Sequence, residues 1–231
     1  MNMDDINEQK IDVLVDEGYA AEQQGDYAKA LECYEKALEI KPNDIYVMNM
    51  VGYALTGIGK YPEAVDAFDR VLRIDPKNIH ALTSQTEALV MFRDFHTALY
   101  QIDKAQKIEP NNIDVLFLKG MTLAGLKKDK EAIHFYDKVI KKSPNHYGAM
   151  FRKGVSLYRL EKYGESTKYF DMVLNHNPEF IEALMFKGLA LRNRGMFKGA
   201  LNCLRQTLEL NPDTPNIQEA IKSCEERMNF Q

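Results

Sequence analysis

One spacing runs through the whole sequence of 231 residues. Six of the eight prolines follow one another at intervals of 34 residues, at Pro42, Pro76, Pro110, Pro144, Pro178 and Pro212. A second series keeps the same interval with glycine at all but one place, at Gly18, Gly52, Thr86, Gly120, Gly154 and Gly188. Two registers that stay in phase over this length indicate an internal repeat, so we expect an array of similar structural units.

Each 34-residue unit is predicted to form two helices. In the second unit, Met48, Val51 and Leu55 recur at helical spacing, which indicates the first helix. Pro62 suits the first turn of the second helix, because its missing N–H costs little there. The proline near the end of each unit also ends this helix, since it disfavours the helical conformation of the preceding residue. One pair cannot bury its own apolar stripe, so the pairs are expected to stack and share a continuous core.

The period, these registers and the segment GDYAKAL at residues 25–31 resemble the tetratricopeptide repeat. The resemblance implies an all-α fold, a right-handed superhelical solenoid of antiparallel helix pairs. It covers six repeats without insertion or deletion: 11–44, 45–78, 79–112, 113–146, 147–180 and 181–214. Residues 1–10 are expected to form a weakly ordered N-terminal tail, and residues 215–231 a capping helix that covers the edge of the last repeat.

The sequence offers no set of residues with the spacing that catalysis or metal binding needs. No two of its five histidines stand three or four residues apart, and the CxxC, HExxH, GxSxG and phosphate-loop motifs are missing. Cys33, Cys203 and Cys224 are too few and too scattered for a disulfide framework, which favours a reducing compartment. We therefore expect a protein that is not an enzyme and that uses no cofactor or metal.

The hydropathy pattern predicts a cytoplasmic protein without membrane contact. No apolar run reaches the roughly 18 residues of a membrane span. The first ten residues are acidic and polar, which is the opposite of a signal peptide.

Charge is divided unevenly along the chain, whose formal net charge is −4. Residues 1–112 carry 11 basic and 20 acidic side chains, a net charge of −9, and residues 113–231 carry 19 and 14, a net charge of +5. A surface built to neutralise phosphates would be basic overall. The related pentatricopeptide repeat, which reads single-stranded RNA, has a period that resembles 35 residues rather than 34. Nucleic acid is therefore not the expected partner.

By resemblance, the second, fifth, sixth, ninth, twelfth and thirteenth places of each repeat line the concave face of the solenoid. From these places we expect a partner-binding groove that includes Tyr19, Tyr46, Asn49, Tyr53, Glu87, Phe117, Met121, Phe151, Arg152, Tyr158, Arg159, Met185, Phe186 and Arg192. Its first half is polar, with tyrosines and carboxylates, and its second half is apolar and aromatic, with three arginines.

Two interpretations of the apolar half are open. In the one that we favour, an exposed patch binds a partner through Phe117, Met121, Phe151, Tyr158, Met185 and Phe186. In the other, Phe117 and Phe151 follow the preference of the family for an aromatic residue at the fifth place, while Leu189 and Val155 pack inside the helix pair. Arg152 and Arg159, seven residues apart on one predicted helix, lie on one face and suit carboxylates of a ligand.

The sequence thus predicts a non-enzymatic scaffold or adaptor that binds a segment of another protein in the concave groove. The expected partner segment carries apolar and acidic residues. Two alternatives remain: a homo-oligomer that occupies its own grooves, and an accessory subunit of an RNA-processing or enzyme complex that uses the basic C-terminal half.

Overall fold

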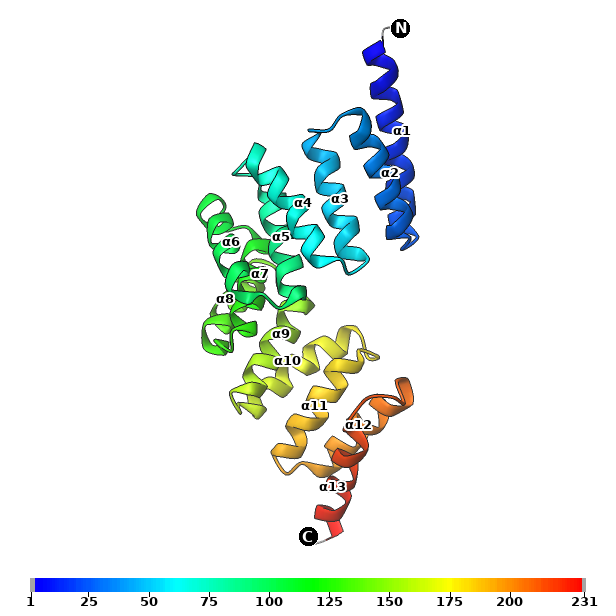
Figure 1. Ribbon diagram of the computed structural model, residues 1–231. Coiled ribbons are helices and arrows are strands. Elements are labelled where there is room, and N and C mark those ends of the chain that lie inside the picture. Colours follow the sequence, from blue (N-terminus) through cyan, green and yellow to red (C-terminus); the bar gives the residue numbers. More distant parts are fainter. Residues whose placement is uncertain (1–2, 230–231) are drawn as a thin grey trace. The chain divides into compact units, whose positions relative to one another are not determined.

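The computed structural model describes residues 3–229, and within this range it contains thirteen α-helices and no strand (Figure 1). This confirms the predicted all-α fold. The helices are α1 (Met3–Gln23), α2 (Tyr27–Ile40), α3 (Ile45–Gly57), α4 (Tyr61–Ile74), α5 (Ile79–Phe92), α6 (Phe95–Ile108), α7 (Ile113–Gly125), α8 (Asp129–Lys142), α9 (Tyr147–Arg159), α10 (Tyr163–His176), α11 (Ile181–Asn193), α12 (Phe197–Leu210) and α13 (Ile217–Asn229).

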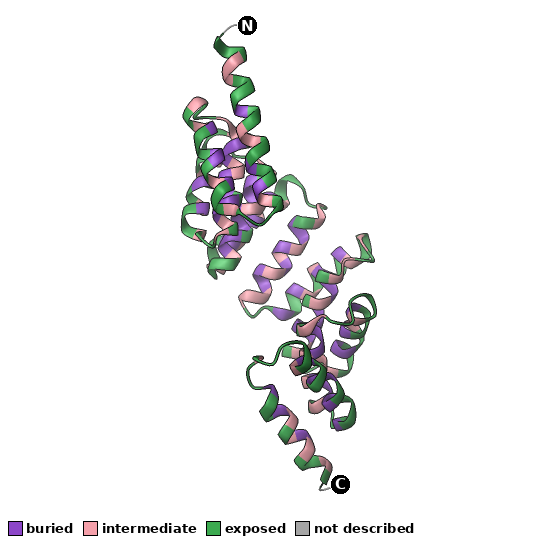
Figure 2. Ribbon diagram, turned by 90° about the vertical axis from the view of Figure 1, so that its right-hand side faces the viewer, coloured by how far each residue is buried: buried purple, intermediate pink, exposed green. Residues whose placement is uncertain are grey.

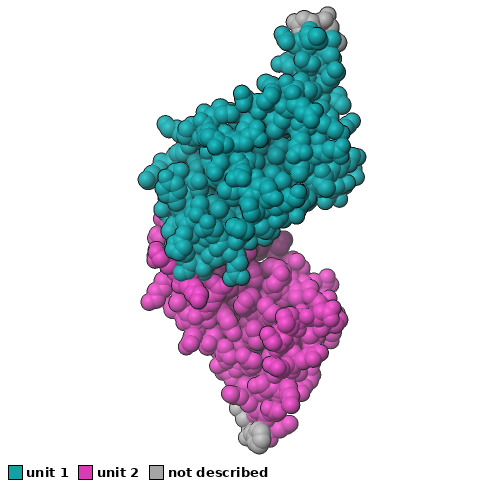
Figure 3. Space-filling model, viewed as in Figure 1, with its two compact units in different colours: residues 1–126 teal, residues 127–231 magenta. Residues whose placement is uncertain are grey.

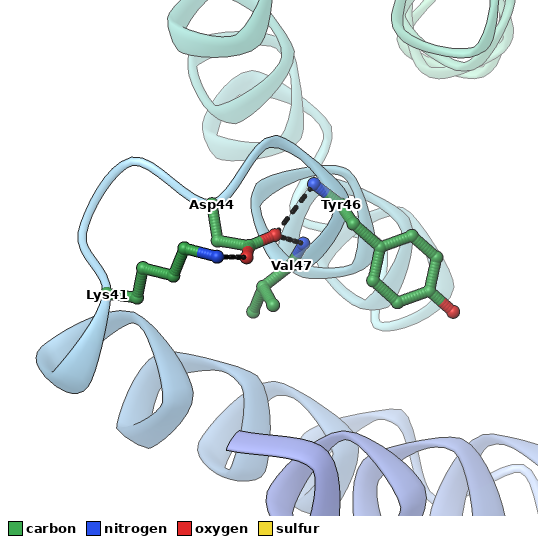
Figure 4. A network of polar contacts seen from close by, with 4 residues as sticks. All are labelled: Lys41, Asp44, Tyr46 and Val47. Carbon is green, nitrogen blue, oxygen red and sulfur yellow. Dashed lines mark hydrogen bonds and ion pairs between the residues drawn. The ribbon is translucent and has the colours of Figure 1, made fainter. Parts of the chain in front are cut away.

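Local sequence signals set where these helices begin and end. Helix α2 ends at Ile40, two residues before a repeat proline, and a short loop leads to α3. Asp44 caps α3: its carboxylate accepts hydrogen bonds from the backbone N–H groups of Tyr46 (3.0 Å) and Val47 (3.2 Å) (Figure 4). Lys41 pairs with the same carboxylate at 3.0 Å. Such a cap satisfies N–H groups that have no partner within the helix.

The turn inside each helix pair needs a left-handed backbone. Gly25, Gly59 and Gly195 supply it with φ between 75° and 81°. In the third and fifth repeats, Arg93 and Glu161 adopt the same conformation with φ of 68° and 59°. The helix pair therefore keeps its geometry where the turn glycine is missing, at the cost of placing a side chain in a region that disfavours it.

Paired helices approach closely because a glycine on the first faces a large side chain on the second. A Cβ added to Gly52 would lie 2.6 Å from the Phe68 ring, and one added to Gly154 would lie 2.7 Å from the Phe170 ring. Both rings are fully buried. The glycines that recur every 34 residues therefore mark the positions where the two helices of a pair pack closely.

A polar ladder connects successive repeats. Each contact joins the second helix of one repeat to the first helix of the next, sixteen residues further along the chain. Its members are Asp69 with Gln85 (2.6 Å), Asp103 with Lys119 (2.7 Å), Asp137 with Lys153, and Asp171 with Lys187 (2.7 Å). The lysine stems are largely covered by their neighbours, so these pairs also fix the register between helices.

The chain divides into two compact units, unit 1 (residues 1–126) and unit 2 (residues 127–231) (Figure 3). The division falls between the two helices of the fourth predicted repeat, 113–146. Each unit has its own buried side chains, on the helix faces that turn toward neighbouring helices (Figure 2). We describe the two units separately.

Both ends of the described chain are helical. Helix α1 begins at Met3, so most of the segment 1–10, expected to be a weakly ordered tail, extends the first helix of the first repeat instead. Asp4 and Asp5 in its first turn favour this extension, since negative charge stabilises a helix N-terminus. The segment expected to form a capping helix contains α13, which packs on α12 and α11 and buries Ile217. Residues 1, 2, 230 and 231 lie outside the described range. No helix among the described residues is long and apolar enough to cross a membrane.

Candidate binding faces

The odd-numbered helices of unit 1 form one surface, which we call the odd-helix face. Helix α3 contacts α5, and α5 contacts α7, whereas each even-numbered helix packs between two odd-numbered ones. Within residues 3–126 no comparable contact joins α2 to α4 or α4 to α6. The odd-numbered helices therefore lie closer together, as expected for the inner side of a curved stack.

Large aromatic side chains are exposed on this face. The exposed fractions are 55% for Tyr19 on α1, and 59% and 46% for Tyr46 and Tyr53 on α3. Glu87 on α5 is exposed, and Asn49 on α3 is partly buried. These five residues are the members of the predicted groove that come from the first three repeats, and their side chains reach the surface of a single unit.

Carboxylates lie close to Tyr53, one of these tyrosines. Partial burial raises the pKa of Tyr53, and neighbouring groups, the carboxylates of Glu22 and Glu87 among them, raise it further. Partial burial also raises the pKa of Glu87, and the charge of Asp114 on α7 adds to this rise. The groups that act on one another come from α1, α3, α5 and α7, so one negative field extends along the odd-helix face.

The charge of the whole unit has the same sign. Residues 1–126 carry 21 acidic and 12 basic side chains, a net charge of −9, whereas residues 127–231 carry 13 and 18, a net charge of +5. The odd-helix face of unit 1 is thus an aromatic and acidic surface, suited to a positively charged ligand.

The six residues of the apolar patch that we favoured from the sequence are only partly exposed. In unit 1, Met121 packs against the cluster that contains Leu82 and Ile102, and Phe117 on the same helix is partly buried. The remaining four residues lie in unit 2, where neighbouring rings and apolar side chains cover them.

In unit 2 the aromatic residues pack on one another. The ring centroid of Phe186 lies 6.0 Å from that of Phe170 and 5.6 Å from that of Tyr158. Phe151 lies 4.9 Å from Phe180 and 6.1 Å from Phe186. Met185 packs with the apolar cluster of the last repeat in a similar way. These aromatic contacts stabilise the stack of helices.

The three predicted arginines occupy different surroundings. Arg152 and Arg159 are exposed on α9, and Arg159 lies 3.6 Å from the carboxylate of the buried Asp129. Arg192 is partly buried and lines a cavity together with Arg194. Arg159 therefore has a partner within the chain, and Arg192 belongs to a separate site.

Metal-ligating and nucleophilic side chains are spread over the part of the chain that the structure describes. Among residues 3–229, no group of three or more histidine, cysteine, aspartate and glutamate side chains is placed to hold a metal ion. All three cysteines are buried, and burial raises the pKa of the Cys203 and Cys224 thiols. Raised pKa values leave these thiols protonated and unreactive at neutral pH.

Comparison with known proteins gives one family and several similar folds. Models of the tetratricopeptide repeat match residues 11–44, 45–78, 114–146 and 181–214. No curated protein sequence matches the chain.

Among solved structures, pilF of Pseudomonas aeruginosa is 18% identical, with a TM-score of 0.77, and the alignment covers 92% of this chain and 97% of that one. YrrB, described as a TPR protein with an unusual peptide-binding site, is 21% identical with a TM-score of 0.63, covering 83% and 99%. MamA (41 to the end) from Desulfovibrio magneticus RS-1 is 20% identical with a TM-score of 0.63, covering 72% and 94%. These similarities concern the fold.

Proposed function

Because the chain belongs to the tetratricopeptide repeat family, whose fold serves as a protein–protein interaction scaffold, we propose that it is a non-enzymatic adaptor that binds a segment of a partner protein. The segment binds to the odd-helix face of unit 1. The observation that carries this proposal is the combination of exposed tyrosines and carboxylates on that face.

The chemistry of the face selects a segment with lysine or arginine side chains. Tyr19, Tyr46 and Tyr53 present aromatic surface, on which cationic side chains stack favourably. Glu22 and Glu87 supply negative charge beside Tyr53. Tyrosines also concentrate binding energy at protein interfaces, because they bury a large area with little loss of side-chain freedom.

The side chain of Asn49 on this face is held by its own helix. The amide nitrogen of Asn49 donates to the carbonyl of Ile45 at 2.9 Å, and this contact fixes the orientation of the side chain. Its amide oxygen is buried and accepts no hydrogen bond within the described chain.

This proposal revises the expected chemistry of the partner. The sequence-based expectation of acidic residues in the partner rested on Arg152, Arg159 and Arg192 of unit 2, where Arg159 pairs with Asp129 and Arg192 lines a separate cavity. A basic segment suits unit 1 better, since its exposed aromatic residues lie among carboxylates.

Peptide binding by the full chain tests the proposal. Fluorescence anisotropy with matched lysine-rich and glutamate-rich peptides should show a clear preference for the lysine-rich one, which weakens as salt is raised. Tyr19→Ala combined with Tyr53→Ala should reduce this affinity at least about tenfold, because two aromatic contacts are lost.

The matched control is Tyr100→Ala. Tyr100 is 63% exposed on α6, an even-numbered helix, and therefore lies outside the odd-helix face. This variant should bind as the unmodified chain does. Equal losses in the control and in the double variant, or a preference for the glutamate-rich peptide, would overturn the assignment of the site.

Self-association is a second candidate, favoured by the opposite net charges of the two units, −9 and +5. The acidic face of one copy would bind the basic unit of another. Sedimentation velocity at low and high ionic strength distinguishes this from an adaptor that works as a monomer. A dimer that dissociates as salt is raised supports self-association, and a monomer at both salt concentrations excludes it.

A further inference from the structure

A polar cavity of about 720 Å³ lies in unit 2, where the end of α11, the start of α10 and the last turns of α13 meet. Three of its seven lining residues are arginines, and none is a carboxylate. The lining residues are Tyr163, Arg192, Asn193, Arg194, Gly195, Ser223 and Arg227.

Two of the arginines come from different helices and lie near the same side chain, Cys224. Arg192 comes from the last turn of α11, and Arg227 from the last turn of α13. Burial raises the pKa of the Cys224 thiol, while the positive charges of Arg192 and Arg227 both act to lower it. Both guanidinium groups therefore lie close enough to Cys224 to act on the same thiol.

The third arginine is held at the rim by the neighbouring helix. Arg194 donates a hydrogen bond from its guanidinium group to the hydroxyl of Thr167 on α10, at 3.4 Å. Its guanidinium group also lies beside Gly164, since a Cβ built there would be 3.9 Å from the Arg194 Cζ atom. This contact holds Arg194 against α10, the helix that supplies Tyr163 to the cavity lining.

These three charges have no carboxylate partner within the described chain, because none of them takes part in an ion pair. Glu225 stands two residues before Arg227 on α13. Its carboxylate is bound instead to Arg205 on α12 at 2.8 Å. Three cations around one cavity repel one another, and a bound anion would offset that repulsion.

We propose that this cavity binds a phosphate monoester. A planar guanidinium group donates two parallel hydrogen bonds to phosphate oxygens, and a dianion balances most of the charge of three arginines. Tyr163, Asn193 and Ser223 add neutral donors to the same cavity. A carboxylate has one charge and two oxygens, so it would leave more of these donors unused.

The organic part of the ester has a place beside the arginines. A largely apolar cavity of about 450 Å³ shares Gly195 with the polar one, and its other lining residues are Met196, Phe197, Lys198, Gly199 and Met228. The ligand is therefore a phosphate group on an apolar or aromatic carrier. This carrier is either a small molecule or a phosphorylated side chain of a partner protein.

Isothermal titration of the full chain with phenyl phosphate and with benzoate tests the proposal. We expect saturable binding of phenyl phosphate and at least about tenfold weaker binding of benzoate. Arg192→Gln combined with Arg227→Gln should weaken phenyl phosphate binding at least about tenfold, because two charge-assisted contacts are lost. The matched control, Arg152→Gln, removes the same charge from α9 and should change the affinity less than about twofold.

Because Arg192 is partly buried, its substitution could impair folding. A second variant at an exposed arginine separates loss of binding from loss of the fold. Arg194 is exposed, so Arg194→Gln should keep the helical circular dichroism unchanged and still weaken binding about threefold or more. A phosphoserine peptide identifies the source of the ligand: tighter binding than phenyl phosphate indicates a modified partner, and weaker binding a small molecule.

Three results would overturn the proposal. They are no saturable binding of either phosphate compound, equal affinity for benzoate, and affinity that is unchanged in both cavity variants. Tight binding of a single-stranded RNA that survives Arg192→Gln with Arg227→Gln would also overturn it, and would favour a phosphodiester partner elsewhere on the basic unit.

Discussion

Unit 1 and unit 2 are built from the same repeat and present different chemistry. On the odd-helix face of unit 1, Tyr19 and Tyr53 occupy the ninth place of their repeats and are exposed among carboxylates. In unit 2 the same place holds Val155 and Leu189, which pack against neighbouring helices. The repeat register therefore determines the backbone and the packing between helices, and the residues at the variable places determine what each unit can bind.

The packing inside each helix pair does not differ between the units. Gly52 faces Phe68 in unit 1 much as Gly154 faces Phe170 in unit 2. The two units share their packing between helices but differ in their surfaces. Aromatic residues therefore have two roles in this chain. Where rings meet other rings they hold helices together, and where they meet solvent beside carboxylates they are available to a partner.

The largest expected effect tests this division of roles directly. Phe186→Ala should lower the free energy of unfolding by about 3 kcal/mol, because it removes a ring that packs against Phe151, Tyr158 and Phe170. Tyr53→Ala, on the exposed face of unit 1, should cost less than about 1 kcal/mol. Urea denaturation of both variants measures the difference, and similar losses would remove the distinction between the two sets of aromatic residues.

A smaller effect tests the packing that the units share. Gly154→Ala should lower stability by about 2 kcal/mol, because the new Cβ would lie 2.7 Å from the Phe170 ring. Gly52→Ala should cost a similar amount in unit 1. Gly164→Ala is the matched control on α10: its Cβ has no atom closer than 3.9 Å, so the better helix propensity of alanine should leave stability unchanged or raise it slightly.

The smallest effect concerns the charge on the odd-helix face. Because the pKa of Glu87 is raised in the folded chain, its ionisation opposes folding, and this cost develops as the pH rises above 4.5 through the folded pKa. Glu87→Gln should therefore stabilise the chain at pH 7, by less than about 1 kcal/mol for so exposed a group. Below pH 4.5 the gain should vanish.

The same variant should weaken binding of the lysine-rich peptide. Thermal melts at pH 4 and pH 7, followed by peptide titration at pH 7, measure both effects. A variant that is less stable at pH 7 would contradict the view that the charge of Glu87 opposes folding. A variant that binds the peptide more tightly would contradict its place in the acidic binding face.

Most of the fold follows from short-range signals in the sequence. Helices end before the prolines because of a local steric conflict, and Asp44 caps its helix from within the same loop. The polar ladder was missed, although its signal is present: Asp103, Asp137 and Asp171 are 34 residues apart, and each is followed by a lysine sixteen residues later.

The sites follow from the sequence only in part. The places of Tyr19 and Tyr53 in the repeat predict that they line a binding groove; both side chains are exposed, and their part in binding stays a prediction. Phe151 is only partly exposed, because the ring of Phe180, the N-cap residue of α11, lies against it, and no sequence spacing marks that contact. The arginine cavity was missed because Arg192 and Arg227 come together only when α13 packs on α11, and no sequence spacing marks that contact.

Amide hydrogen exchange of the full chain, with and without the lysine-rich peptide, tests the central claim that the odd-helix face of unit 1 is the partner-binding site. Slower exchange should appear in α1, α3 and α5, and exchange in α9 and α11 should be unchanged. Protection confined to unit 2, or equal protection by the glutamate-rich peptide, would contradict it.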